Sequence, residues 1–304
     1  MKARPFIKWV GGKGKLLPQL QNYYPKDLLN NNIKKYVEPF VGGGALFFEI
    51  IQKYNIDKAY ISDINKDLIS TYRIIQQHAN ELLTILEKYQ KEYNNTNIDN
   101  RNDLFLSKRN EFNNLNNHID YNIISKELIK KSALLIFLNK TCFNGLFRLN
   151  SKGLFNVPFG KYANPKIFDE QNIYAVSKIL QNVDIRITNY SECYDIIDDK
   201  TFIYFDPPYK PINKSSSFTT YNGKIFDDNE QVILSKFLHK INDEKNAKIM
   251  LSNSDPKNEN ENDDYFDKLY KGFFINNIEA SRFINCKGDK RGKIKELIIT
   301  NYEI

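Results

Sequence analysis

The hydrophobic pattern of the chain is of two kinds. Short apolar runs rich in β-branched and aromatic residues are typical of buried strands. Apolar residues that recur at helical spacing are typical of amphipathic helices. The first kind predicts strands at residues 35–40, 59–62, 184–187, 201–205, 247–251, 273–278 and 296–301. The second kind predicts helices at residues 45–52, 68–75, 82–89 and 128–138.

A helical block interrupts the alternation of strands and helices. It begins after the second predicted strand and ends before the third, so we expect an α/β domain with a helical insertion. We place the discontinuous catalytic domain at residues 1–66 and 169–304 and the inserted module at residues 67–168. An asparagine-rich stretch at 94–102 predicts a polar linker inside the module. Outside it, an acidic and polar stretch at 255–267 predicts a solvated loop.

The most informative motif follows the predicted strand at 201–205. Asp206, Pro207, Pro208 and Tyr209 place a carboxylate, two prolines and an aromatic ring at the carboxyl end of that strand. Each proline fixes its own φ and lacks an N–H, so the carbonyls of the turn can accept hydrogen bonds from a ligand. This clamp suits a flat base with an exocyclic amine, since Tyr209 can stack on the ring while Asp206 and the Pro207 carbonyl accept the amine hydrogens. The alternative is a strand that simply ends in a Pro-Pro turn.

A glycine turn after the first predicted strand indicates a nucleoside cofactor. Strand, glycine loop, helix, strand and acid follow one another here, as at the start of a Rossmann-like unit. Glu38, just before glycines 42–44, would repel a phosphate but suits a cationic group such as a sulfonium. Asp63, at the tip of the next strand, can accept hydrogen bonds from ribose hydroxyls. The pocket therefore fits S-adenosylmethionine, with a generic nucleotide-binding loop as the alternative.

A second glycine-rich turn, at residues 6–15, combines glycines with basic residues. It lacks the G-x-x-x-x-G-K-[ST] spacing of a P-loop because Leu16 follows Lys15, which disfavours a kinase or an ATPase. Trp9 is the single tryptophan of the chain, and core packing is the alternative to a functional role for it.

The charge balance favours a polyanionic partner. The chain has 44 Lys and Arg against 37 Asp and Glu, which gives a net charge of +7 over 304 residues. Basic residues gather near both ends: Lys2, Arg4, Lys8, Lys13 and Lys15, and then Lys287, Lys290, Arg291, Lys293 and Lys295.

Cysteine and histidine usage argues against a metal site. Cys142, Cys193 and Cys286 fit neither a disulfide framework nor a zinc spacing, and the chain has three histidines. We therefore expect no metal. No apolar run of 18 residues and no signal segment occurs, so we expect no membrane association and a cytoplasmic location.

Taken in order, these motifs resemble the α-group adenine-N6 DNA methyltransferases of the Dam and DpnII type. The matching segments are residues 6–13, 37–44 and 206–209, and residues 139–160 are similar to the DNA-contacting hairpin of that family. Residues 290–296 are also similar, and the likeness covers nearly the full length. The resemblance implies a Rossmann-like S-adenosylmethionine-dependent methyltransferase domain with a mixed, mostly parallel sheet. It also implies that the helical module is a target-recognition domain with a β-hairpin.

The resemblance assigns roles to individual residues, with the motif at 206–209 holding the extruded adenine. It implies that S-adenosylmethionine is bound by Trp9, Lys13, Glu38, Pro39, Phe40, Gly42 and Asp63, with Asp206 at the pocket edge. It implies that DNA is contacted by Lys8, Phe143, Asn144, Leu146, Arg148 and Pro158.

Within this DNA-contacting set, Lys8 would read the first guanine of a GATC site. Leu146, Arg148 and Pro158 would read the outer base pairs at the other end, although a phosphate contact is the alternative for Arg148. Phe143 and Asn144 would enter the space left by the flipped base. Phe143 stands where several members of the family carry tyrosine, and it keeps the stacking face.

The implied activity is methyl transfer from S-adenosylmethionine to N6 of a flipped-out adenine in double-stranded DNA, within GATC and without a metal. Another adenine-containing site, such as a longer relative of GATC, is one alternative. A methyltransferase acting on cytosine N4 or on a protein amide is a second, although Asp rather than Ser or Asn precedes Pro-Pro-Tyr. A non-catalytic DNA-binding protein is the third alternative. We expect a monomer, and whether a cognate restriction endonuclease acts beside it stays open.

Overall fold

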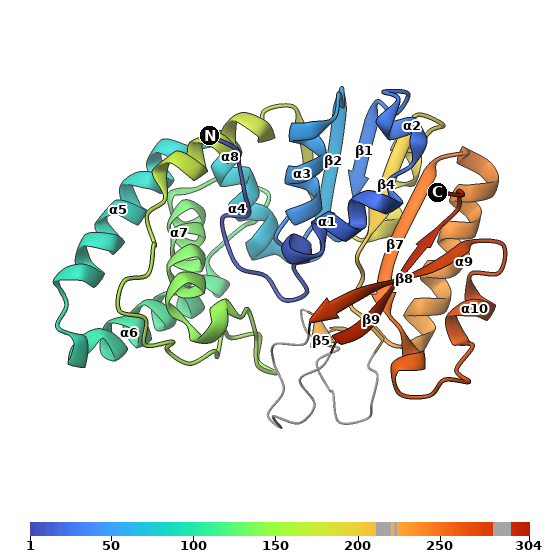
Figure 1. Cartoon of the computed structure of the whole chain (residues 1–304). Coiled ribbons are helices and arrows are strands. Elements are labelled where there is room, and N and C mark those ends of the chain that lie inside the picture. The colour runs from blue at the N-terminus through green and yellow to red at the C-terminus, as the bar shows by residue number, and fades with distance from the viewer. Residues whose placement is uncertain (211–219, 222–223, 282–292) are drawn as a thin grey trace. The chain divides into compact units, whose positions relative to one another are not determined.

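The computed structural model describes residues 1–210, 220–221, 224–281 and 293–304, and Figure 1 shows the course of the chain. The strands of its main sheet are β1 (Lys35–Glu38), β2 (Lys58–Asp63), β3 (Val183–Ile187), β4 (Thr201–Phe205), β7 (Lys248–Ser254), β8 (Phe274–Ser281) and β9 (Lys293–Thr300). A small antiparallel pair joins β5 (Thr220–Tyr221) to β6 (Lys224–Ile225). Cys286, Lys287, Lys290 and Arg291 lie outside the described residues.

The main sheet of the described residues has seven strands in the order β3-β2-β1-β4-β7-β9-β8. Strands β1, β4 and β7 pair in parallel, whereas β9 is antiparallel to both β7 and β8. All residues of β4 are buried, as expected for a central strand of a parallel sheet. The predicted α/β class, with a mixed and mostly parallel sheet, is confirmed.

The helices accompany these strands along the chain. They are α1 (Leu17–Leu20), α2 (Lys26–Leu29), α3 (Ala45–Lys53), α4 (Lys66–Gln77), α5 (Ala79–Asn95), α6 (Arg101–Asn114), α7 (Lys126–Thr141), α8 (Glu170–Leu180), α9 (Asp228–Lys245) and α10 (Tyr265–Leu269). Two of the long helices begin at capping residues, since the side chains of Asn65 and Ser125 accept hydrogen bonds from the N–H groups of Leu68 and Leu128.

Every apolar run predicted as a strand is a strand in the structure, and the helices α3, α4, α5 and α7 were predicted as well. The first strand ends at Glu38 rather than at residue 40, because Pro39 has no N–H for the sheet ladder. The solvated loop predicted at 255–267 is wrong at its start, where Asp255 and Pro256 are buried, and at its end, where α10 begins.

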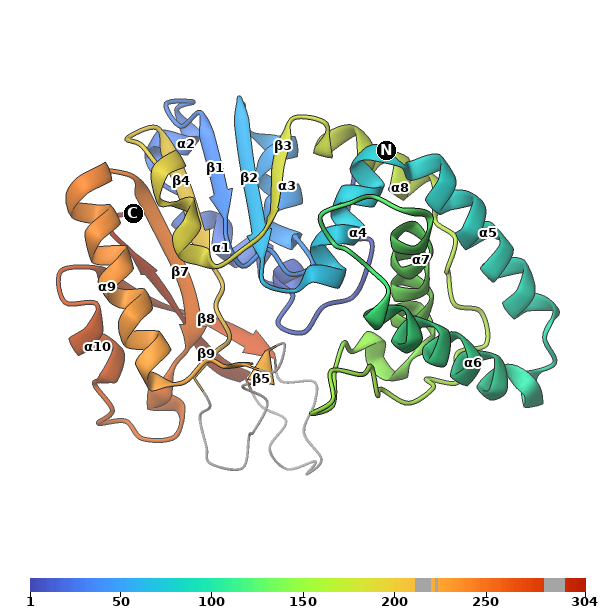
Figure 2. The ribbon, with the colours of Figure 1, turned by 180° about the vertical axis from the view of Figure 1, so that it is seen from behind.

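The chain forms two compact units, which we describe separately. The first contains residues 1–13, 41–52 and 61–189, and the second contains residues 14–40, 53–60 and 190–304. In the first unit, α7 packs against α4, α5 and α6 and is buried along most of its length (Figure 2). In the second unit, α9 packs on β7 over a core of aliphatic and aromatic side chains. No described helix has the length and apolarity needed to cross a bilayer.

Candidate active site

In the second unit, two parallel strands end at the same edge of the sheet, each beside an acidic residue. Val37 of β1 lies opposite Ile203 of β4, so Glu38 and Asp206 both lie at the carboxyl ends of their strands. Glu38 is buried, and its Oε2 accepts a hydrogen bond from the Tyr36 hydroxyl at 2.6 Å. This edge of an open α/β sheet is where ligands usually bind.

The electrostatics of this edge are negative. Burial raises the pKa of Tyr204 well above its ordinary value, and the carboxylates of Asp206 and Glu38 raise it further. The Tyr204 hydroxyl and Ser252 Oγ are 2.8 Å apart and share a hydrogen bond. Because several carboxylates act on one buried hydroxyl, the edge suits a cationic ligand better than a phosphate.

Residues 206–210 follow β4 and contain the motif predicted from sequence to hold the base, and we call them the catalytic loop after that prediction. Asp206 and Tyr209 are partly exposed, whereas Pro207 is buried. The Tyr209 hydroxyl donates to Glu296 Oε2 of β9 at 2.8 Å. Burial raises the pKa of Tyr209 well above its ordinary value, so the phenol remains protonated and the hydrogen bond persists. The ring is therefore held at its hydroxyl end and remains partly accessible.

Phe40 belongs to an aromatic cluster in the same unit. Its ring stacks on Tyr190, with centroids 5.3 Å apart, and meets the edge of Phe226 at 6.0 Å. Phe40 is only partly buried by these contacts. Part of its ring is therefore accessible, while Pro39 beside it is buried, and the role of both in binding the cofactor stays a prediction.

In the first unit, the N-terminal segment packs on the glycine turn. Gly42 and Gly44 have positive φ values of 47° and 72°. A Cβ at Gly42 would lie 2.8 Å from Trp9 Cδ1, and one at Gly44 would lie 2.6 Å from the Tyr72 hydroxyl. Glycine is therefore required at both positions by conformation and by space.

Asp63 ends β2 beside this turn. It is buried, and its carboxylate accepts hydrogen bonds from Gly42 N at 3.3 Å and from Asn65 N at 2.9 Å. Lys13 is also buried, and its ammonium donates to the Gly11 carbonyl at 2.8 Å. The first unit thus brings together Trp9, Gly42 and Asp63 of the predicted cofactor residues.

Residues 139–160, which we call the recognition hairpin, are joined to the N-terminal segment by Asn139. This buried side chain accepts from Lys8 N and donates to the carbonyls of Lys8 and Gly145, each at 2.8 Å. Trp9 stacks on Phe147 of the hairpin at 5.3 Å. The segment that carries Lys8 and Trp9 is therefore fixed to the hairpin on one side and to the glycine turn on the other.

The recognition hairpin presents its predicted DNA-contacting residues at the surface. Phe143 is 51% exposed, so the face of its ring is accessible from solvent. Asn144 has a positive φ of 55° and donates its N–H to the Tyr162 hydroxyl. Arg148 and Pro158 are exposed and Leu146 is partly buried. The Arg148 guanidinium donates from Nε to Asn156 Oδ1 at 2.8 Å.

Several residues of the site had no role assigned to them from sequence. Asn139 fixes the N-terminal segment, whereas Gln231, Asn253 and Glu296 hold the catalytic loop. One feature of the sequence could have identified such residues: a polar residue at the end of a buried strand, such as Asn253 of β7, because ligands bind at the ends of strands in α/β sheets.

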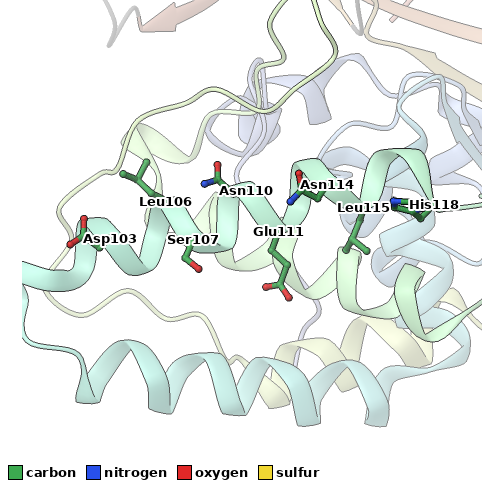
Figure 3. Close-up of a pocket in the computed structure, with 8 residues that line it drawn as sticks. All are labelled: Asp103, Leu106, Ser107, Asn110, Glu111, Asn114, Leu115 and His118. Atoms are coloured by element: carbon green, nitrogen blue, oxygen red, sulfur yellow. The ribbon is translucent and has the colours of Figure 1, made fainter.

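A cavity of about 620 Å³ lies along α6 of the first unit (Figure 3). Its lining combines the apolar Leu106 and Leu115 with polar side chains, among them the carboxylates of Asp103 and Glu111 and the imidazole of His118. None of the predicted cofactor, base or DNA residues lines it. An acidic lining opposes DNA phosphates, so we place the candidate site elsewhere.

Comparison with known families decides between the alternatives. A family model described as D12 class N6 adenine-specific DNA methyltransferase matches residues 9–284. The chain belongs to this family. It is therefore an adenine-specific DNA methyltransferase whose substrate is DNA, and the family implies S-adenosylmethionine as the methyl donor.

Three relatives match this chain over nearly the whole length of both proteins. The Type II methyltransferase M.MjaIII of Methanocaldococcus jannaschii is 47% identical over 303 residues, which cover 99% of this chain and 100% of the relative. The Type II methyltransferase M1.LlaDCHI of Lactococcus lactis subsp. cremoris is 37% identical, covering 99% and 96%. The DNA adenine methylase of Escherichia coli strain K12 is 30% identical, covering 98% and 95%.

Proposed function

We propose that this methyltransferase acts on N6 of an adenine that is flipped out of double-stranded DNA, within GATC. The observation that carries the proposal is the position of Asp206 and Tyr209, both partly exposed, after a fully buried strand that runs parallel to the strand ending at Glu38. The relatives named DNA adenine methylases support an adenine target.

In this proposal the catalytic loop activates the amine. The adenine N6 lone pair is delocalised into the ring, so the amine is a poor nucleophile. Asp206 and the Pro207 carbonyl accept its two hydrogens, which favours a pyramidal nitrogen with a localised lone pair. Stacking on Tyr209 contributes about 1–3 kcal/mol and offsets part of the cost of base flipping. The proton leaves after methyl transfer, when the nitrogen is strongly acidic, so no histidine base is needed.

We further propose which residues bind the methyl donor. We assign Glu38 to the positive charge of the amino-acid part and Asp63 to the ribose, and we assign Trp9, Lys13 and Phe40 to further contacts with the donor. The glycine turn supports this proposal because Gly42 lies against Trp9 and donates its N–H to Asp63, two of the residues assigned to the donor. When bound, S-adenosylmethionine supplies an electrophilic methyl group on its sulfonium, and pre-alignment of the reacting atoms provides much of the acceleration.

DNA recognition is assigned to residues 67–168, with residues 1–66 and 169–304 as the catalytic domain. Lys8 reads the first guanine of the site, and Leu146, Arg148 and Pro158 read the outer base pairs. Phe143 and Asn144 fill the space of the flipped base, which agrees with the exposure of Phe143.

The names of the relatives support a proposal for the biological setting. Two of them are Type II methyltransferases, so we propose a restriction-modification role with a separate cognate endonuclease. We also propose that the chain acts as a monomer and in the cytoplasm, where bacterial and archaeal DNA is located.

The proposal is tested by expressing the chain in a methylation-free host and sequencing its DNA with a method that reports N6-methyladenine. We expect methylation at the adenine of GATC and nowhere else. Modified cytosine in the same DNA, or unmodified DNA from a host that makes folded protein, would refute it. If N6-methyladenine occurs in a different sequence motif, the proposed reaction is correct and the proposed GATC recognition sequence is wrong.

A further inference from the structure

The catalytic loop is fixed by side chains from outside it. Pro207 and Pro208 have no N–H, so the backbone of the loop has few donors with which to fix itself. Two buried amides supply the missing bonds. Gln231 Nε2 donates to the Pro208 carbonyl at 3.1 Å, and Lys210 N donates to Asn253 Oδ1 at 3.2 Å.

Gln231 and Asn253, which we call the amide relay, also bond to each other. Asn253 Nδ2 donates to Gln231 Oε1 at 3.1 Å. Asn253 Oδ1 further accepts from Ser254 N at 2.9 Å, and Ser254 Oγ donates to the Lys210 carbonyl at 2.8 Å. Both relay side chains are 0% exposed. These partners fix the orientation of each amide, because reversing either one would place donor against donor or acceptor against acceptor.

The relay residues are located on regular elements. Gln231 lies in α9 and Asn253 lies near the end of β7. Lys210 adds a surface tie to the same helix, since its ammonium is 2.6 Å from Asp228 Oδ1. Hydrogen bonds therefore anchor the loop to a helix and a strand of one compact unit. Sites that are supported by regular elements hold their geometry more precisely than sites on loops alone.

We propose that Gln231 and Asn253 are positioning residues for methyl transfer. By holding Pro208 and Lys210 they set the directions in which Asp206 and the Pro207 carbonyl face the adenine amine. The relay and Ser254 also engage the carbonyls of Pro208 and Lys210, which removes two competing acceptors from the amine. This inference rests on the proposed function, because it needs an amine at the loop.

The first test compares Gln231→Met with a matched control, Asn301→Leu. Asn301 binds the opposite end of β7, where it accepts from Ile249 N at 2.8 Å and donates to the Ala247 carbonyl at 2.8 Å. Both variants lose amide bonds in the same unit and should lose thermal stability. Only Gln231→Met should lower the single-turnover methylation rate on a GATC duplex, on the order of 10²-fold, as a misplacement of about 1 Å does.

Binding measurements distinguish a slower methyl-transfer step from weaker binding of the cofactor or of the DNA. The Kd of Gln231→Met for S-adenosylhomocysteine and for the duplex should change by less than about threefold, since uniform binding is not lost. A loss confined to binding, or an equal loss of rate in Asn301→Leu, would show that the relay only supports the fold and would overturn the inference.

Gln231→Glu supplies a readout that does not depend on the stability of Gln231→Met. A protonated carboxyl can donate to the Pro208 carbonyl, whereas a carboxylate cannot, and burial raises the pKa of such a group. Its single-turnover rate relative to wild type should therefore rise as the pH falls. A ratio that stays constant with pH would count against the relay.

The wild-type chain serves as the reference for both ideas. If it makes N6-methyladenine and Gln231→Met methylates at the same rate, the relay proposal alone fails. If it makes no N6-methyladenine, the proposed function fails and the relay proposal fails with it.

Discussion

The catalytic loop and the recognition hairpin differ in how their side chains are held. In the loop, Pro208, Tyr209 and Lys210 bond to partners on α9, β9 and β7. In the hairpin, Phe143 is exposed, and the guanidinium of Arg148 bonds to Asn156, eight residues further along the same hairpin. The three loop residues are thus bonded to elements outside the loop, whereas the Phe143 ring is open to solvent and the Arg148 guanidinium is bonded within the hairpin.

This difference matches two physical tasks. Methyl transfer requires atoms held to within a fraction of an ångström, so buried, satisfied polar groups around the loop are useful. Readout of a base edge requires exposed donors and an aromatic face that DNA can reach. Changes near the loop should therefore alter the rate, and changes in the hairpin should alter sequence discrimination.

The largest effect is expected for Asp206→Ala. It removes a carboxylate that accepts an amine hydrogen in our proposal, so the single-turnover rate should fall by at least about 10²–10³-fold, as when one preorganised partner of a transition state is lost. Duplex affinity should remain, since the hairpin is untouched. Near-normal turnover would remove Asp206 from the chemistry.

The next effect concerns Arg148→Ala on the hairpin. A bidentate contact to guanine provides about 1–3 kcal/mol of discrimination at one base pair. The variant should lose this preference when methylation rates on GATC and on singly substituted duplexes are compared. Lys152→Ala, an exposed change on the same hairpin, is the control and should weaken all duplexes alike. Equal losses on all duplexes with Arg148→Ala would indicate a phosphate contact.

A smaller effect is expected for Asn139→Ala, which releases Lys8 from the hairpin. Asn172 is the matched control because it clasps Arg4 in the same way, accepting from its N and donating to its carbonyl, each at 3.0 Å. Both variants should lose about 1–3 kcal/mol of stability. Only Asn139→Ala should reduce discrimination at the first base pair, by about 1 kcal/mol. If both variants discriminate equally well at the first base pair, Lys8 does not read that base pair.

The smallest effect is expected for a change of Lys140, which lies in the last turn of α7, where the recognition hairpin begins. Burial lowers its pKa to about 8, although Asp169 opposes the shift, and the cations Lys8, Arg4 and Lys166 favour it. The unfolded chain therefore binds more protons between about pH 8 and pH 10.4, the ordinary lysine value, so this group makes stability rise with pH in that window. Urea unfolding at a series of pH values should show a smaller rise in the free energy of unfolding for Lys140→Met than for the wild type. An equal rise in both proteins would contradict the prediction.

Sequence reasoning predicted the sheet well because its strands are short, apolar and rich in β-branched residues. It predicted α7 but missed α6, where Phe105 and Phe112 are the buried residues and most of the other side chains are polar. Such a helix has little apolar period to detect. The burial of these two aromatic side chains holds α6 in the fold, and no continuous apolar stripe runs along the helix.

The residues of the candidate site also fall into two groups, those that could be predicted from sequence and those that could not. The residues that stand in local motifs, such as Asp206 and Glu38, could be named from sequence because their neighbours in the chain carry the signal. Gln231, Asn253 and Glu296 could not, because each acts on a loop between 20 and 90 residues away along the chain. Partners of this kind become visible only once the fold brings the segments together.

The most direct test of the central claim is fluorescence of a duplex in which 2-aminopurine replaces the target adenine of GATC. Stacked 2-aminopurine is quenched, and an everted base is bright. We predict a strong rise when the wild-type protein binds with S-adenosylhomocysteine, and no rise when the probe occupies the adjacent position. A duplex that stays dark, while the same protein methylates adenine at that site, would contradict the account.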